Sequence, residues 1–160
     1  MLGRETAPLT LLEYGDYECP YCGAAHPSVK QVLQVLGDDL VFAYRHFPLT
    51  QIHPHAGGAA EAAEAAGVQG RFWPYHDLLF EHQDRLSTRD LVGYAEQLGL
   101  DVERFVSDLK QHKYAPRVRE DFVSGVRSGV NGTPTFFANG LRHNGGYDPE
   151  TLVAALLASR

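Results

Sequence analysis

The fold of this chain is decided by one stretch near its start, Leu12-Glu13-Tyr14-Gly15-Asp16-Tyr17-Glu18-Cys19-Pro20-Tyr21-Cys22. Residues 10–14 are largely apolar, which predicts a short strand in a sheet that is covered on both faces. A turn over residues 15–18 leads to a helix that begins near Pro20, because proline at a first helical position has its φ already set and loses no donor that the helix needs. The two cysteines therefore stand at the junction between a strand and a helix.

The helix that follows the cysteines has one apolar face and a defined end. Its apolar residues recur at helical spacing, and they are Val29, Val32, Leu33 and Leu36. Gly37 supplies a C-terminal stop. Residues 40–47 then read as a second strand, which Pro48 ends. Strand, helix and strand make a βαβ unit, for which we expect parallel pairing and a right-handed crossover.

The middle of the chain, residues 51–128, carries helical patterns and no strand pattern. The segment from Pro54 to Ala66 contains seven alanines, whose small side chains favour a helix and permit close packing. Ser87, with Asp90 three residues on, has the pattern of an N-cap with an acidic partner. Further helices are expected over residues 72–82, between Ser87 and Gly99, from Asp101 to Leu109, and through Val118, Phe122 and Val126.

The end of the chain returns to the sheet. Asn139-Gly140 separates two short strands, residues 135–138 and 141–143, and Asn-Gly is the strongest short hairpin signal. Asp148-Pro149 then opens a last helix. The sequence therefore predicts an α/β fold of order βαβ, helical insertion, ββα, with one discontinuous domain over residues 1–50 and 129–160 and an inserted helical subdomain over residues 51–128.

Composition narrows the possible partners. The 160 residues hold 14 Lys and Arg against 20 Asp and Glu, a formal net charge of −6, which argues against a nucleic-acid partner because phosphates are bound mainly by cations. No apolar run approaches the roughly 20 residues of a membrane span, so we expect no membrane partner either. The start of the sequence lacks the apolar core of a secretory signal. We expect a cytoplasmic protein as the sequence stands, and an extracytoplasmic one if a signal segment has been removed.

The Cys19–Cys22 pair has a specific chemical meaning at the start of a helix. The helix dipole and the unpaired amides of the first turn stabilise an anion there, so the pKa of Cys19 should be lowered and the residue should be largely thiolate near neutrality. The thiolate is the species that attacks a disulfide. Cys22 projects to the same side one turn later, where it can close a disulfide with Cys19. The pattern therefore favours a redox pair.

A metal site and a pair of inert buried thiols are the alternatives to this redox pair. Structural zinc usually takes four ligands, commonly from two CxxC pairs, and the chain has only one such pair. His26 lies four residues after Cys22 on the same helical side and could join a three-ligand site. We expect no metal, and the metal reading stays as the weaker alternative.

The stretch from Leu12 to Cys22 resembles the active-site strand, loop and helix start of DsbA-like members of the thioredoxin superfamily. A distant second motif, Val130-Asn131-Gly132-Thr133-Pro134-Thr135-Phe136-Phe137, looks like the cis-proline loop of that superfamily. The helical insertion between the two motifs also matches the DsbA-like layout. The resemblance covers residues 8–158 and implies a thioredoxin-like fold.

The resemblance also implies roles for individual residues. Cys19 would be the exposed nucleophile and Cys22 its buried partner. Pro134 would follow a cis peptide bond, lie against the disulfide, and leave the Thr133 backbone to pair with an extended substrate chain. Glu13 matches a buried acid that assists proton transfer at the inner cysteine, since burial raises the pKa of a carboxyl. The alternative for Glu13 is a sheet edge facing solvent.

Pro20 and Tyr21, the residues between the cysteines, tune the thiolate. DsbA itself has Pro-His there, whereas Pro-Tyr is typical of glutaredoxins, so the sequence departs from the strongest oxidant pattern. Loss of the histidine removes one donor to the thiolate. We therefore expect Cys19 to be less acidic, and the protein less oxidising, than the strongest oxidants of this fold.

Taken together, these features predict a DsbA-like protein-disulfide oxidoreductase that exchanges disulfides with protein or peptide thiols through Cys-Pro-Tyr-Cys. It needs no dissociable cofactor, and an unidentified redox partner must reset the pair. One alternative is a glutathione-dependent transferase or isomerase on a related fold, although such enzymes lack the paired cysteines. The other is a metal-binding or peptide-binding module that uses the same cysteines.

Overall fold

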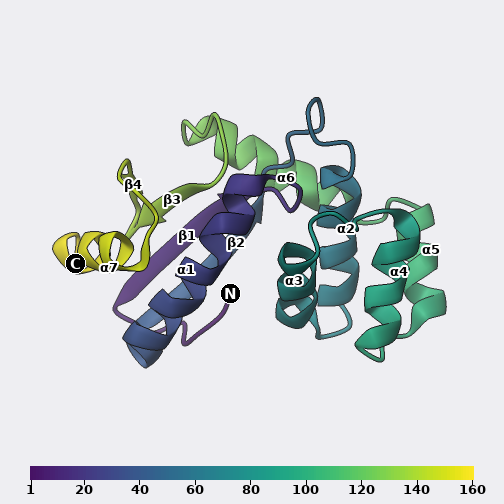
Figure 1. Cartoon of the computed structure of the whole chain (residues 1–160), viewed down its shortest axis with the longest axis horizontal. Coiled ribbons are helices and arrows are strands. Elements are labelled where there is room, and N and C mark those ends of the chain that lie inside the picture. Colours follow the sequence, from purple (N-terminus) through teal and green to yellow (C-terminus); the bar gives the residue numbers. More distant parts are fainter.

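The computed structural model describes residues 1–160, and its centre is a four-stranded sheet of order β2-β1-β3-β4 (Figure 1). Strand β1, Leu9–Gly15, lies inside the sheet. It pairs in parallel with β2, Leu40–His46, and antiparallel with β3, Thr135–Ala138. Strand β4, Leu141–His143, completes the sheet antiparallel to β3. The expected parallel pairing of the first two strands is confirmed.

Helix α1, Pro20–Leu36, connects β1 to β2 and is bounded as the sequence predicts. Cys19 is its N-cap residue and Pro20 occupies the first turn. The helix ends at Gly37, whose φ of +49° is a left-handed conformation that glycine adopts readily, and the short 3₁₀ helix Gly37–Asp39 follows. These bounds place the cysteines at the N-terminus of a long helix that packs beside the sheet.

The C-terminal hairpin also forms where it is expected. Asn139 and Gly140 have φ values of +51° and +84°, and positive φ at both central residues is the signature of the tight hairpin turn that Asn-Gly favours. Helix α7, Pro149–Ala158, follows, and the Asp148 side chain caps it by accepting from the Thr151 amide. This helix packs against α1 and against strands β1 and β3.

Four helices form a separate group beside the sheet (Figure 1), namely α2, Ala56–Gly67, α3, Phe72–Glu81, α4, Thr88–Gln97, and α5, Val102–Lys110. Helix α2 contacts the other three, and its seven alanines are all buried. Ser87 and Asp90 form the expected capping box of α4, and Asp101 caps α5. Small side chains on α2 thus let its neighbours approach closely, as the sequence predicts.

Helix α6, Ala115–Arg127, returns from this group to the sheet and packs on β2. The ring of Phe122 stacks on that of Phe47 with centroids 4.3 Å apart. Gly125 lies so close that a Cβ there would be 2.8 Å from the Phe47 ring. The helix expected through Val118, Phe122 and Val126 is confirmed, and within it Val126 is exposed. Helix α6 therefore joins the helical group to the sheet, and the subdomain limits of residues 51–128 stay a prediction.

The α/β order βαβ, helices, ββα is confirmed, and one large core spans it. The main cluster of 28 buried residues includes Leu11 of β1, Cys22 of α1 and Phe105 of α5. None of the helices combines the length and the apolar character that a membrane crossing requires.

Candidate active site

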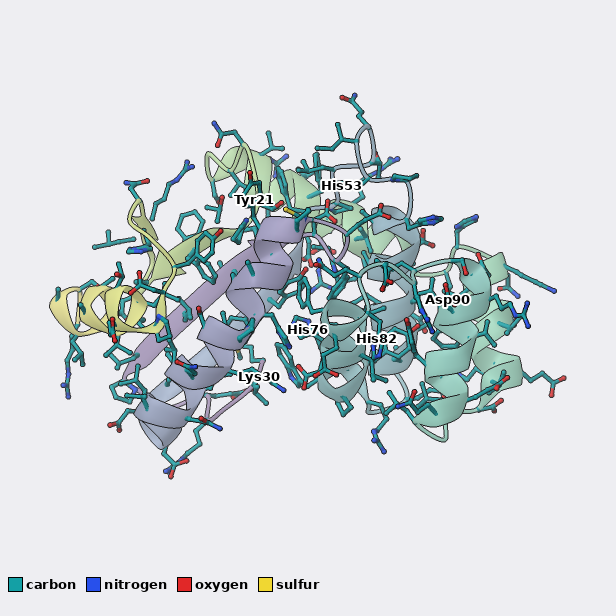
Figure 2. All side chains as sticks on the ribbon, viewed as in Figure 1. Tyr21, Lys30, His53, His76, His82 and Asp90 are labelled. Atoms are coloured by element: carbon teal, nitrogen blue, oxygen red, sulfur yellow. The ribbon has the colours of Figure 1, made fainter.

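The candidate site lies at the N-terminus of α1, the end at which Tyr21 is labelled in Figure 2. Cys19 has extended backbone angles, and its carbonyl oxygen accepts the first helical hydrogen bond from the Gly23 amide at 3.1 Å. Cys22 lies in the first turn, and both cysteines are free thiols. The strand-to-helix junction thus holds the pair as the sequence predicts.

Both thiols are buried. Cys22 is fully buried, and only 3% of Cys19 is exposed, so the expectation of an exposed Cys19 is wrong. The cover comes from the far end of the chain, because the Cys19 Sγ donates to the Thr133 carbonyl oxygen at 3.6 Å. Tyr21, between the cysteines, is 66% exposed. The nucleophile candidate therefore lies just beneath a surface that Tyr21 forms in part.

The loop that covers Cys19 has the expected backbone form, since the Thr133–Pro134 peptide bond is cis. The Thr133 hydroxyl is buried and has no hydrogen-bond partner while Cys19 is a thiol. Buried polar groups nearly always have a partner, so an unpaired hydroxyl calls for an explanation. A thiolate at Cys19 supplies one, because the anion accepts the proton that the hydroxyl can donate.

The two cysteines have opposite pKa shifts. The pKa of Cys19 falls from 9.0 to about 5, chiefly because the Cys22 thiol donates a hydrogen bond to it. Burial opposes the shift, and the Thr133 side chain and the Cys22 and Tyr21 amides support it. The pKa of Cys22 is raised well above 9.0 by burial, by that same hydrogen bond, and by the charges of Glu13 and Cys19. Near neutrality the pair is one thiolate and one thiol, with the amides contributing as expected.

Glu13 lies on β1, one of the two interior strands of the sheet, where it is opposite Tyr44 of β2 and Phe136 of β3. It is only 3% exposed, so the alternative of a solvent-facing sheet edge is wrong. Burial raises the pKa of its carboxyl from 4.5 to about 8, and the charge of Cys19 adds to the rise. A carboxyl with this pKa can give and take a proton near neutral pH.

Asp16 organises the turn before Cys19, a role that its expected place in a turn does not predict. Its buried carboxylate accepts from the Glu18 amide at 2.8 Å, from the Leu49 amide at 2.9 Å and from the His53 ring at 2.8 Å. These bonds fasten the turn to the segment after β2, in which His53 is labelled in Figure 2. The Asp16–Glu18 bond is an Asx turn, and the aspartate two residues before Glu18 was a usable signal for it.

Gln83, two residues after the end of α3, is a second site residue that the sequence pattern does not mark. Its side-chain amide donates to the carbonyl oxygens of Tyr17 and Cys19 at 3.0 and 2.8 Å. The partners are more than sixty positions apart, and no local pattern marks such a contact. Gln83 thus ties the helical group to the active-site turn.

Comparison with known proteins gives one family and a consistent set of structures. A family model described as Thioredoxin matches residues 1–158. A thioredoxin-like oxidoreductase from Silicibacter pomeroyi DSS-3 is 26% identical with a TM-score of 0.88, covering 99% of this chain and 90% of that one. BdbD from Bacillus subtilis is 23% identical with a TM-score of 0.86 over 98% and 90% of the two chains. The oxidoreductase DsbA from Xylella fastidiosa is 19% identical with a TM-score of 0.76 over 96% and 87%. These likenesses confirm the predicted fold class.

Curated sequences that match this chain carry a different kind of name. A protein from Salinispora arenicola named Na(+)/H(+) antiporter NhaA 1 is 51% identical over 157 residues, which is 98% of this chain and 24% of that protein. The Na(+)/H(+) antiporter NhaA from Herminiimonas arsenicoxydans is 49% identical over 99% of this chain and 25% of that protein. The chain thus spans about a quarter of the length of the curated relatives it matches.

Proposed function

The chain belongs to the thioredoxin family, and from this premise we propose that it is a DsbA-like protein-disulfide oxidoreductase whose redox centre is Cys19-Pro20-Tyr21-Cys22. One observation carries the proposal. Within one helical turn, the pKa of Cys19 is lowered to about 5 while that of Cys22 is raised well above its usual value. The Cys19 sulfur is therefore a thiolate that can attack a disulfide, whereas the Cys22 sulfur stays protonated as a thiol.

In the reducing direction the Cys19 thiolate attacks one sulfur of a substrate disulfide. A mixed disulfide forms, and the other substrate sulfur leaves as a thiolate. Glu13 then takes the proton of Cys22, whose sulfur attacks Cys19, and the substrate is released with both of its sulfurs reduced. The enzyme ends with a Cys19–Cys22 disulfide, so the two electrons that it loses are those that the substrate gains.

In the oxidising direction the same steps run backwards. A substrate thiolate attacks Cys19 of the enzyme disulfide, and Cys22 leaves as a thiolate that the Glu13 carboxyl protonates. A second substrate thiolate attacks the mixed disulfide at the substrate sulfur and displaces the Cys19 thiolate. The substrate gains a disulfide and the enzyme is reduced. A separate redox partner must then reoxidise the enzyme.

Substrate contact is assigned to the loop that covers Cys19. The Thr133 carbonyl oxygen is within 3.6 Å of the Cys19 sulfur, so an extended chain paired with the Thr133 backbone has its own sulfur brought to the reacting one. Pro134 holds this loop over the pair. Backbone pairing does not read side chains, which suits an enzyme that accepts many protein or peptide thiols.

The rival functions make different use of the thiols. A glutathione-dependent transferase or isomerase would need one thiol or hydroxyl, and the opposed pKa shifts of Cys19 and Cys22 would have no purpose. A metal- or peptide-binding module would need both sulfurs as ligands, and a proton-exchanging Glu13 would add nothing to it. The lowered pKa of Cys19 beside the raised pKa of Cys22 favours disulfide exchange.

Substitution of each cysteine tests the proposal. Cys19→Ser should abolish insulin reduction, whereas Cys22→Ser should accumulate mixed disulfides that dithiothreitol releases, because nothing then resolves them. Titration with mild oxidant should remove both wild-type thiols together and reversibly. Full turnover by the Cys19→Ser variant would overturn the assignment of the nucleophile. Loss of the thiols one at a time would favour a rival function.

The antiporter names of the curated relatives favour a specific partner. We propose that this protein serves a Na(+)/H(+) antiporter by exchanging its own disulfide or dithiol with thiols of that antiporter, so that the two electrons gained by one protein are those lost by the other. The Cys22→Ser variant should then be recovered in a dithiothreitol-sensitive conjugate with a co-expressed antiporter from which the matching region has been deleted. Equal recovery of a variant lacking both cysteines would show that the association does not involve the thiols.

The direction of net electron flow also decides between the two expected compartments. A reductant of this fold has a potential near about −270 mV and a strong oxidant one near about −120 mV. With Pro-Tyr between the cysteines, we propose a value below that of the strong oxidants and a cytoplasmic role. Equilibration against a glutathione buffer gives the potential, and a value close to that of the strong oxidants would support an extracytoplasmic role instead.

A further inference from the structure

Helices α1 and α3 face each other across a seam that the exchange mechanism does not use (Figure 2). His26 on α1 meets His76 and Asp77 on α3 there, and one ligand atom from each of the three lies within 4.8 Å of the others. His26 Nε2 is 3.4 Å from Asp77 Oδ1. Two imidazoles and a carboxylate thus converge from elements that lie far apart in the sequence.

The His26 ring carries an unexplained buried atom. Its Nε2 has no hydrogen-bond partner, and only 9% of the His26 side chain is exposed. Native structures rarely leave a buried side-chain nitrogen unsatisfied, and an absent ion is one of the accepted explanations. The nitrogen faces Asp77 at a distance too long for a hydrogen bond of good geometry and suited to two ligands of one ion.

The distances fit a first-row metal. With metal–ligand bonds of about 2.0–2.1 Å, neighbouring ligands of a tetrahedral zinc ion lie about 3.4 Å apart. The His26–Asp77 pair already has that separation, and the third ligand atom, within 4.8 Å of the other two, has to move closer by at most about 1.4 Å. Asp77 is 32% exposed, so solvent or a small ligand has access to a fourth position.

The His76 ring has a second contact that suits a metal ligand. The Nδ1 of His76 is hydrogen-bonded to the Tyr17 hydroxyl at 2.8 Å. A hydroxyl can accept a proton from Nδ1 as well as donate one to it; when it accepts, Nε2 offers a lone pair, which is the usual arrangement of a metal-bound histidine.

We propose that His26, His76 and Asp77 bind one divalent transition-metal ion, with zinc as the best match, and that the ion fastens α1 to α3. Two neutral imidazoles with one carboxylate and an open position are a donor set that zinc accepts. The site is separate from Cys19 and Cys22, and its role is to lock the helix that bears them against the helical group. The metal site takes no part in disulfide exchange, so the proposal does not depend on the proposed function.

Substitution of Lys30 distinguishes a metal site from a simple ion pair at Asp77. Its ammonium donates to Asp77 Oδ2 at 3.0 Å, which leaves Oδ1 facing His26. The positive charge opposes a bound cation, and the half-exposed side chain has to turn away when the ion enters. Lys30→Gln should therefore tighten metal binding, whereas a seam held only by the His26–Asp77 and Lys30–Asp77 contacts would gain no metal affinity from that change.

The test uses tag-free protein in its oxidised form, in which the disulfide removes both thiols as ligands. Cobalt(II) is the probe, because a tetrahedral site gives it visible absorption bands, and zinc is then added to displace it. We expect saturation at one cobalt per chain. His26→Gln and Asp77→Asn should weaken binding by at least about tenfold. The matched variant His112→Gln, in an exposed side chain, should leave the affinity unchanged.

Several results would overturn the proposal. One is an affinity that His26→Gln and Asp77→Asn leave unchanged, and another is cobalt binding that appears only in the reduced protein with sulfur charge-transfer bands. The third is the absence of saturation up to about a hundred micromolar metal in protein whose circular dichroism shows it folded. Zinc should also raise the melting temperature of the oxidised wild type and not that of Asp77→Asn, because a ligand bound only to the native state stabilises it.

Discussion

The side-chain amide of Gln83 donates a 2.8 Å hydrogen bond to the carbonyl oxygen of Cys19, 64 residues away in the chain. The same nitrogen reaches the Tyr17 carbonyl at 3.0 Å. These two bonds hold the turn before α1 against the end of α3, so the helical group helps to set the position of the nucleophile. The residue has no part in the chemistry and acts as a positioning residue.

Gln83→Ala should lower the free energy of unfolding by about 1–3 kcal/mol, because two part-buried carbonyl groups lose their shared donor. Urea unfolding of the oxidised protein measures the change. Gln111→Ala is the matched control, since its exposed amide bonds only to Ser107, and it should change stability by less than about 0.5 kcal/mol.

A second substitution shows whether Gln83 acts through this contact. A Cβ at Gly23 would be 2.0 Å from Gln83 Oε1, so Gly23→Ala must displace the Gln83 side chain. The double variant Gly23→Ala, Gln83→Ala should then lose less stability than the sum of the single variants. Strict additivity would mean that Gln83 is not held where the structure places it.

Glu13→Gln should stabilise the oxidised protein more at pH 8 than at pH 5. With the Cys19 thiolate beside it the carboxyl has a pKa of about 8, against an ordinary value of 4.5. In the oxidised protein that charge is absent, and burial, which is the larger cause, still raises the pKa, so the folded state binds the extra proton between pH 4.5 and its own raised pKa. The contribution of the carboxyl to stability is present below pH 4.5 and is lost as the pH rises toward that raised pKa. Glutamine is neutral throughout and escapes this loss.

Urea unfolding at pH 5, 6, 7 and 8 gives the comparison for Glu13→Gln, and the oxidised form removes the titration of the cysteines. Glu96→Gln, at an exposed site, should run parallel to the wild type. A Glu13→Gln curve that is also parallel to the wild type would show that the carboxyl is not buried as described. In the reduced enzyme the same variant should resolve mixed disulfides more slowly, because the Cys22 proton loses its acceptor.

Thr133→Val should raise the pKa of Cys19. The side chain of Thr133 is among the groups that lower this pKa, and its hydroxyl has no other partner, while valine has nearly the same shape. The absorbance of the thiolate near 240 nm against pH measures the midpoint. Thr133→Ser keeps the hydroxyl and should restore a value near that of the wild type; if it behaves like valine, packing and not hydrogen bonding is responsible.

Gly125→Ala should destabilise the protein by about 1–3 kcal/mol, because the new methyl group enters the space of the Phe47 and Tyr14 rings. Gly93 is the matched glycine, since it also lies in a helix and a Cβ there meets nothing within 4 Å. Gly93→Ala should raise stability by up to about 1 kcal/mol through helix propensity. Thermal unfolding of both variants decides whether α6 is seated on the sheet as described.

Much of the fold was readable from the sequence because its signals are local. Pro20 marked the start of α1 and Gly37 its end, and Asn139-Gly140 marked the hairpin, since each residue favours its backbone conformation without help from the rest of the chain. Helix α6 shows the limit of this reasoning. Its apolar spacing predicted a helix and could not say that Val126 would face solvent while Gly125 met the sheet.

The site residues that lie close together in the sequence could be predicted. The contacts that residues distant in the sequence make with them could not. Cys19, Cys22 and Glu13 lie on consecutive elements, and their junction was expected. The burial of Cys19 depends on the Thr133 carbonyl, 114 residues later, and no pattern around the cysteine reports such a cover. The contacts of Gln83 with the active-site turn, and of His26 with His76, could not be predicted for the same reason, because the partners are far apart in the sequence.

The contact between Cys19 and Thr133 can form only after both residues have been synthesised. The ribosome makes both cysteines before it makes the carbonyl that shields the first sulfur, which follows Cys19 by 114 residues. Throughout that interval the nascent chain presents an unprotected dithiol to whatever oxidants or thiols surround it. The nucleophile is thus synthesised well before the group that covers it.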